Sequence, residues 1–195
     1  FLDLPKQELS EAQRAAKWHL HPRTLVDRDG LRIGLIMLIA GVAFAAALVF
    51  LAGYAAENGV PGAASLFFIA FAAASLVARL FVGRIQDAYG DNIVIYPSLA
   101  LNAAGNVLLA MWPTTTGIVA AGVLIGFGFG SLMPSAQTIT VKSVPMSRVP
   151  VATASFFLLL DAGSGIGPIV LGALMPLTGG SGMFLLCAGL VLVSM

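Results

Sequence analysis

Long apolar stretches alternate with short polar gaps along most of the chain. A helix needs roughly 20 apolar residues to cross a hydrocarbon core about 30 Å thick. The stretches are continuous, with no alternation at every second residue, so they predict helices and not the strands of a transmembrane barrel. The six stretches that meet or approach this length are Leu31–Tyr54, Val60–Val82, Asn92–Trp112, Thr115–Thr140, Val151–Leu174 and Gly182–Met195.

We therefore expect an all-α membrane protein with six transmembrane helices in residues 31–195. The last stretch covers about 14 residues, which at about 1.5 Å each is too short to cross a bilayer. It reaches Met195 without a polar flank, so we interpret it as a truncated span. The first residue is Phe1, and no cleavable signal pattern follows it. Both ends are typical of an internal fragment of a longer protein.

Composition excludes several other classes of protein. Hydrophobic residues make up 58% of the chain and charged residues 10%, whereas soluble domains have about 25% charged residues. Cys187 is the only cysteine, which excludes a disulfide scaffold, and a net charge of +1 gives no electrostatic reason to expect nucleic acid. The sequence has no phosphate-binding loop, no Ser–His–Asp set and no metal cluster. We expect neither enzyme activity nor a cofactor.

The distribution of Lys and Arg predicts the orientation of the helices. All ten of these residues lie in the segment through Arg32 or in and beside the second and fourth gaps. The gaps near Glu57, Pro113 and Thr178 hold none. Because Lys and Arg are enriched in cytoplasmic loops, we expect the basic side to face the cytoplasm, in an inner or plasma membrane.

Residues 1–30 are expected to form a cytoplasmic loop or linker. Ser10 and Gln13 have the spacing of a capping box, and apolar residues recur nearby at helical spacing. A short helix at the membrane surface and a solvated linker with one helical turn both fit this segment. His19 and His21 lack further candidate ligands, so they do not predict a metal site.

The junction between the second and third spans lies on the basic side. Gly83 lets two helices approach closely, Asp87 places a negative charge at the bilayer surface, and Gly90 permits a tight reversal of the chain. Read alone, these residues predict a helix hairpin with charged ends.

This junction resembles the signature loop of the major facilitator superfamily, which has a Gly, three residues, an Asp, two residues, a Gly and then basic residues. Gly83, Asp87 and Gly90 match the pattern, and Arg84 is compatible with it. The residues after Gly90 depart from it, because an acidic and a neutral residue replace the usual basic pair.

Arg79 and Arg84 suggest two roles for the junction. Either could lie at the membrane surface as a positive anchor, with its long side chain reaching the polar region. Alternatively, Arg79 could pair with Asp87 or with Asp91, and such a salt bridge could gate the cytoplasmic side.

Two glycine-rich stretches fit the same family. The fourth span carries Gly126, Gly128, Gly130 and Pro134, and the fifth carries Gly163, Gly167, Pro168 and Gly172. The second set is similar to the Gly-x-x-x-Gly-Pro pattern of drug:proton antiporters. Small residues at a spacing of four let helices pack closely, and proline bends a helix. We expect these positions to serve tight packing, or to be hinges where one helix bundle moves against another.

The resemblance implies the C-terminal half of a twelve-helix secondary transporter, built from two inverted three-helix repeats. It also implies the partners: a missing N-terminal six-helix half, the lipid bilayer, a small-molecule substrate and protons.

Asp161 is the most informative single residue. It lies about ten residues into the fifth predicted span, which is roughly 15 Å at helical rise and close to the middle of the membrane. A carboxylate is costly at that depth, so it faces protein or water. It could carry protons or contact substrate as water access alternates, or it could hydrogen-bond a neighbouring helix. Asn102 and Asn106, four apart on the third span, are expected to form interhelical hydrogen bonds.

In the major facilitator superfamily the first and fourth spans of each half line the central cavity. The candidates in this chain are Met37, Phe44, Phe127, Met133 and Gln137. A sugar or an anion would require several convergent polar groups, and this half offers few. We therefore expect proton-coupled efflux of a hydrophobic or amphipathic molecule by alternating access. The alternatives are uptake or symport of a small metabolite, a membrane scaffold or receptor that moves no solute, and a six-helix protein that acts as a homodimer.

Overall fold

The computed structural model describes residues 28–195, with side chains from Arg32 onward, and it has no strand within this range. Most of the expected linker, residues 1–27, lies outside the described part. The elements are α3 (Arg28–Glu57), α4 (Ala63–Tyr89), α5 (Asn92–Met111), α6 (Thr115–Lys142), the short 3₁₀ helix η2 (Met146–Arg148) and α7 (Val149–Val193).

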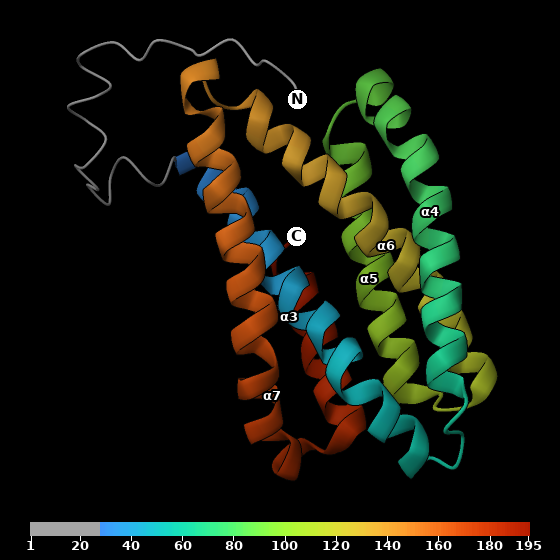
Figure 1. Cartoon of the computed structure of the whole chain (residues 1–195). Helices are drawn as coiled ribbons and strands as arrows, with labels where there is room; N and C mark the ends of the chain where they lie inside the picture. Colours follow the sequence, from blue (N-terminus) through green and yellow to red (C-terminus); the bar gives the residue numbers. More distant parts are fainter. Residues whose placement is uncertain (1–27) are drawn as a thin grey trace, which may run out of the picture.

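Five helices in the described range are long and apolar enough to cross a membrane, where the sequence predicted six spans. The fifth and sixth predicted spans are joined in α7, which has 45 residues. Helix geometry is interrupted inside α7 at Gly179, whose φ of 67° and ψ of 175° lie outside the helical region. Figure 1 shows the chain reversing its direction near this point, at the start of the red part. The sixth crossing therefore stays a prediction.

The boundary of α4 also differs from the expected span. The apolar stretch ends at Val82, but the helix continues to Tyr89 and is stopped by Gly90, with a φ of 90°. Backbone hydrogen bonding can continue through polar residues that leave the membrane, whereas hydropathy marks only the buried part. As a result Gly83 and Asp87 lie on a helix, and only Gly90 lies in the turn.

The helices pack as two pairs with α5 between them. α3 packs mainly against α7, and α4 packs mainly against α6, while α5 contacts both α6 and α7. Figure 1 shows α3 and α7 side by side in one part of the bundle, and α4 and α6 in the other. The part of α7 before Gly179 runs in the same direction as α3, and α6 runs in the same direction as α4.

Glycines on α6 allow its backbone to approach that of α4. A Cβ atom at Gly122 would lie 2.7 Å from the carbonyl oxygen of Phe67, and one at Gly126 would lie 2.6 Å from that of Phe71. One turn further, a Cβ at Gly130 would be 2.5 Å from the side-chain oxygen of Ser75. These distances leave no room for a side chain. Spacing of four on both helices keeps the seam in register.

The pair of α3 and α7 has a similar seam. A Cβ at Gly163 would collide with the carbonyl oxygen of Leu38, and one at Gly167 would lie 3.0 Å from the Cα of Val42. Gly172 lies further along α7 in ordinary contact distance of the Phe50 ring. α7 thus meets α3 through glycines spaced by four, as α6 meets α4.

Gly128 faces a third direction. A Cβ there would lie 2.7 Å from the Ser98 carbonyl oxygen and 2.7 Å from the backbone nitrogen of Asn102, both on α5. Two residues advance a helix by about 200°, so Gly128 points away from the seam formed by Gly126 and Gly130. The glycine-rich stretch of α6 therefore serves two neighbours at once.

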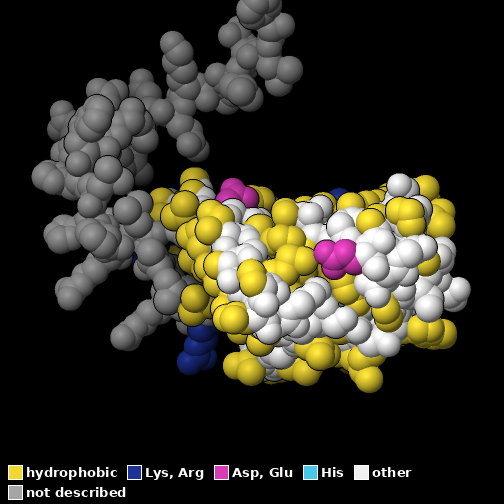
Figure 2. Space-filling model, turned by 90° about the horizontal axis from the view of Figure 1, so that it is seen from below, with side chains coloured by type: hydrophobic (Ala, Val, Ile, Leu, Met, Phe, Trp, Pro, Cys, Tyr) yellow, Lys and Arg dark blue, Asp and Glu magenta, His cyan; other side chains and the backbone are white. Residues whose placement is uncertain are grey.

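Apolar side chains cover much of the outside of the bundle. Figure 2 shows the face seen from below with many hydrophobic side chains and only a few charged ones. Long apolar residues of α4 and α7, among them Ile69, Leu80, Leu158 and Ile169, are well exposed. An apolar exterior of this extent suits contact with lipid tails.

The glycine seam leads to a stability prediction. Gly126→Ala should lower the free energy of unfolding by about 1–3 kcal/mol, the usual cost of overpacking, because its methyl group meets the backbone of α4. Gly53→Ala is the matched control, since nothing lies within 4 Å of a Cβ there, and it should be neutral or stabilise by about 0.5–1 kcal/mol. Thermal unfolding in detergent measures both, and an equal loss in the two variants would contradict the seam.

Candidate functional site

The signature residues lie at the end of the bundle where α4 meets α5. Gly83, Arg84 and Asp87 lie on the last turns of α4, and Gly90 makes the reversal into α5. A Cβ at Gly83 would meet nothing within 4 Å. Within the described residues, Gly83 therefore faces open space.

Asp87 pairs with a residue of α6. Its Oδ1 atom lies 3.3 Å from the Nζ atom of Lys142, the last residue of that helix. The sequence suggested Arg79 as the partner of Asp87. The structure has Lys142 in that place, because the packing of α4 on α6 brings Lys142 to Asp87. Exposed pairs of this kind contribute about 0–1 kcal/mol.

Asp91 is held by Gln86, a residue that the sequence analysis did not single out. The Nε2 atom of Gln86 donates to Asp91 Oδ1 over 2.7 Å. Gln86 is buried although it lies near the polar end of α4. Its position after Ala78 and Val82, on the same buried face of α4, is the signal that could have identified it.

Asp161 lies on the outside of the described bundle. It is about 12 residues into α7, or about 18 Å from the start of that helix at helical rise, and its side chain is exposed. Leu158 and Gly165, on the same face of α7 at helical spacing, are also exposed. No hydrogen bond or ion pair joins Asp161 to another residue of the described range. The interhelical hydrogen bond suggested for it is absent from residues 28–195.

The candidate cavity residues do not form one group. Met37 is fully buried in the core, while Phe44 and Met133 are partly buried and pack against that core. Gln137 is also partly buried. Phe127 lies apart from them, in a groove of about 220 Å³ formed with α4 and α5. The cavity-lining role of these residues stays a prediction.

Phe44 is the centre of an aromatic cluster that joins three helices. Its ring stacks on Phe129 of α6 with 4.3 Å between the ring centres, and on Phe71 of α4 with 5.4 Å. Phe67 extends the cluster along α4. Stacked aromatic pairs add roughly 0.5–1.5 kcal/mol to the burial of their area. The cluster therefore ties α3 to the α4–α6 pair, across the division between the two helix pairs.

The two asparagines of α5 pair within the helix. Asn106 Nδ2 donates to the Asn102 carbonyl oxygen over 2.9 Å and lies 3.0 Å from Asn102 Oδ1. Both residues are fully buried, and Asn102 Nδ2 and Asn106 Oδ1 have no partner among the described residues. Within the described part of the chain, the expected interhelical hydrogen bonds are therefore not formed. Close packing of the Asn102 backbone against Gly128 brings this part of α5 against α6 without them.

Tyr54 makes the interhelical hydrogen bonds at the opposite end of the bundle. Its hydroxyl donates to the carbonyl oxygen of Leu109 on α5 over 2.9 Å and lies 3.0 Å from Ser181 Oγ on α7. Its ring meets the edge of Phe184, with 5.1 Å between ring centres. One buried side chain therefore ties α3 to α5 and to the part of α7 that follows Gly179.

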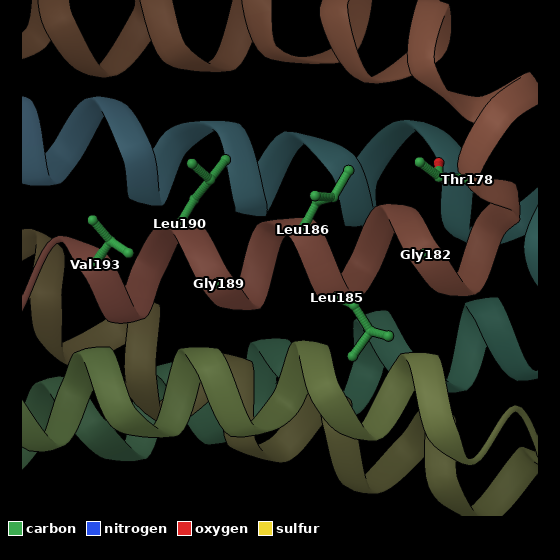
Figure 3. A pocket seen from close by; sticks show the side chains of 7 residues that line it. All are labelled: Thr178, Gly182, Leu185, Leu186, Gly189, Leu190 and Val193. Carbon is green, nitrogen blue, oxygen red and sulfur yellow. The ribbon is translucent and has the colours of Figure 1, made fainter.

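The part of α7 after Gly179 has a shallow apolar groove. Figure 3 shows the side chains of Leu186 and Leu190 on one side of this segment and that of Leu185 on the other, with Gly189 between Leu186 and Leu190 and Gly182 nearer to Thr178. The groove holds about 550 Å³ and has no charged side chain among its lining residues. A second groove of about 460 Å³, between α3 and α7, is lined by apolar residues and glycines. Neither offers converging polar groups for a polar ligand.

Comparison with known families identifies the family of the chain. The family model described as Major Facilitator Superfamily matches residues 33–195. This chain belongs to the Major Facilitator Superfamily. The membership agrees with the match of Gly83, Asp87 and Gly90 to the family's signature loop, and together with the five long apolar helices it supports a multi-pass membrane protein.

Curated members of the Major Facilitator Superfamily resemble the chain in part. It is 28% identical over 137 residues to an uncharacterized MFS-type transporter of Burkholderia mallei, in an alignment that covers 70% of this chain and 33% of that protein. A transporter of Burkholderia pseudomallei matches to the same extent. This chain is also 30% identical over 95 residues to the efflux pump roqT of Penicillium rubens, in an alignment that covers 49% of this chain and 18% of the pump. The alignment with the bacterial relatives thus spans about a third of their length.

The aromatic cluster leads to a prediction for Phe44. Phe44→Ala should lower the free energy of unfolding by about 3 kcal/mol, the lower end of the range for such truncations in a core, because it removes both stacked contacts. Phe81→Ala is the matched control, since Phe81 is largely exposed on α4, and it should cost about 0.5 kcal/mol or less. Chemical or thermal unfolding in detergent compares them. Similar losses would show that the cluster does not connect the helix pairs.

Proposed function

We propose that this chain is one half of a secondary transporter that exports a hydrophobic or amphipathic small molecule in exchange for protons, by alternating access. The observation that carries the proposal is the exposed carboxyl of Asp161, about 18 Å into α7 at helical rise. A carboxylate facing lipid tails at that depth is costly. A carboxyl that faces water or a second bundle can bind and release a proton as access to each side alternates.

The exposed face around Asp161 supports a missing N-terminal half. Gly165 lies one turn further along α7, and a Cβ there would meet nothing within 4 Å. The same holds for Gly83 on α4, so both helices present sites where another transmembrane helix can approach closely. The partial coverage of the bacterial relatives fits a second bundle outside this chain.

Helix pairing supports six crossings and two inverted repeats. Suppose that α7 before Gly179 is the fifth helix and α7 after Gly179 is the sixth. An inverted repeat then matches the first helix with the fourth, the second with the fifth and the third with the sixth. Under this match the contact between α3 and α7 corresponds to the contact between α6 and α4. Both pairs meet through glycines spaced by four. Inverted repeats of this kind are common in secondary transporters.

The charge distribution supports the orientation and the substrate class. Arg84, Lys142 and Arg148 lie near one end of the bundle, which we assign to the cytoplasm by the enrichment of basic residues there. Among the described helices only Arg79 lies comparably deep, about 15 Å from the Tyr89 end of α4 at helical rise, and one Arg is fewer than the several converging groups that an anionic substrate would need. The aromatic cluster around Phe44 suits a hydrophobic molecule, and the Penicillium relative is an efflux pump by name.

Transport by the full-length protein in liposomes tests the role of Asp161. The probes are ethidium, a lipophilic cation, and Nile red, a neutral lipophilic dye. Asp161→Asn should reduce proton-driven efflux to the level of protein-free liposomes, because the amide cannot carry a proton, while exchange of dye between the two sides continues. Asp161→Glu should retain proton-driven efflux.

Glu57→Gln is the matched control, because Glu57 is an exposed acid at the last residue of α3, away from the depth of Asp161. This variant should transport like the parent protein. Full proton-driven efflux by Asp161→Asn would refute the proton role. No protein-dependent movement of either dye would contradict the proposed substrate class.

A further inference from the structure

Gln86 joins three helices at the end of the bundle where α4 meets α5. It is only 4% exposed. Its Nε2 atom donates to Asp91 Oδ1 over 2.7 Å and to the backbone carbonyl oxygen of Ser135 over 3.3 Å. Asp91 is the N-cap residue of α5, and Ser135 lies on α6. One amide on α4 therefore reaches both neighbouring helices.

The ion pair of Asp87 and Lys142 also joins α4 to α6, but it lies in water. The side chains are 74% and 56% exposed, respectively. Exposed ion pairs contribute little, because water already stabilises the separate charges. The hydrogen bond from Gln86 to Asp91 has a charged acceptor and a buried donor, which makes it stronger. The buried amide is the more important connection of the two.

The contact lies next to a proline inside α6. Pro134 has no backbone N–H, so α6 loses one hydrogen bond at the turn next to Ser135. The hydroxyls of Thr138 and Thr140 bond the carbonyl oxygens four residues earlier. The buried hydroxyl of Ser135 has no partner within the described part of the chain. Gln86 thus supplies the side-chain hydrogen bond that links this turn to its neighbours.

We propose that Gln86 is a positioning residue that holds the ends of α4, α5 and α6 together as a unit while the transporter changes conformation. The role in the cycle rests on the proposed function, but the unit itself can be tested without transport. The Asp87–Lys142 ion pair is then an accessory contact. Loss of Gln86 lets the end of α6 separate from α4.

A thiol at position 135 of the full-length protein reports this separation. Ser135→Cys replaces a hydroxyl that has no partner among the described residues, so the substitution removes no hydrogen bond seen there. In this background the thiol reacts with a water-soluble maleimide only when the ends of α4 and α6 come apart. Cys187 is fully buried in the last part of α7 and serves as the internal control for global unfolding.

Gln86→Ala should raise the labelling rate at position 135 by at least about tenfold, the factor expected when a hydrogen bond to a charged group is lost. Lys142→Ala should raise it about fivefold or less, because the exposed pair contributes little. Cys187 should stay unlabelled in both variants. Unchanged protection in Gln86→Ala, or a larger effect in Lys142→Ala, overturns the proposal.

A second pair of variants decides the case if Gln86→Ala also exposes Cys187. Asp91→Asn keeps an oxygen that can accept the hydrogen bond from Gln86, whereas Asp91→Ala removes it. The proposal expects labelling at position 135 to be slower in the first variant, which keeps a neutral acceptor, than in the second. Equal rates in the two variants contradict it.

A transport measurement separates positioning from folding. Asp87→Cys and Lys142→Cys, joined by a short bismaleimide, tether α4 to α6 covalently. With ethidium as the probe, Gln86→Ala should lower the maximal rate at unchanged KM, and the tether should restore that rate. No restoration refutes the role of Gln86 in the cycle. If the parent protein moves no dye at all, the proposed function fails while the labelling result still decides whether Gln86 holds the helices together.

Discussion

Direct contact between helix backbones is the constraint on which this bundle depends. Lipid tails are as apolar as the side chains, so helices in a membrane gain little from burying apolar surface against each other. They associate by close packing instead, and here that packing needs residues without a Cβ. The carbonyl oxygens of Leu38 and Phe71 occupy the space where side chains of Gly163 and Gly126 would stand. Both helix pairs follow from this constraint.

Between the pairs, side chains make the connections. The rings of Phe44 and Phe129 cross from α3 to α6. The Tyr54 hydroxyl connects α3 to α5 at one end, and the Gln86 amide connects α4 to α5 at the other. The helix pairs are therefore closely packed units, and α5 is fixed between them at both of its ends.

Much of this fold could be predicted from the sequence, because apolar length and glycine spacing are local properties. The helical class and the positions of four long helices follow from them, and the family follows from the resemblance of Gly83, Asp87 and Gly90 to its signature loop. The extent of α4 could not be predicted, since hydropathy marks the membrane boundary and Gly90 ends the helix beyond it. The contacts of Gln86 and Tyr54 depend on residues far apart in the chain. The exposure of Asp161 likewise depends on which face of α7 meets α3.

Two of the hydrogen bonds that cross between helices end on backbone carbonyl oxygens, those of Leu109 and Ser135. Every amino acid carries such an oxygen, so the accepting positions can change in evolution without losing the bond. Only the donors, Tyr54 and Gln86, must keep their chemistry. Sequence drift in related proteins should therefore be freer at the acceptor positions than at the two donors.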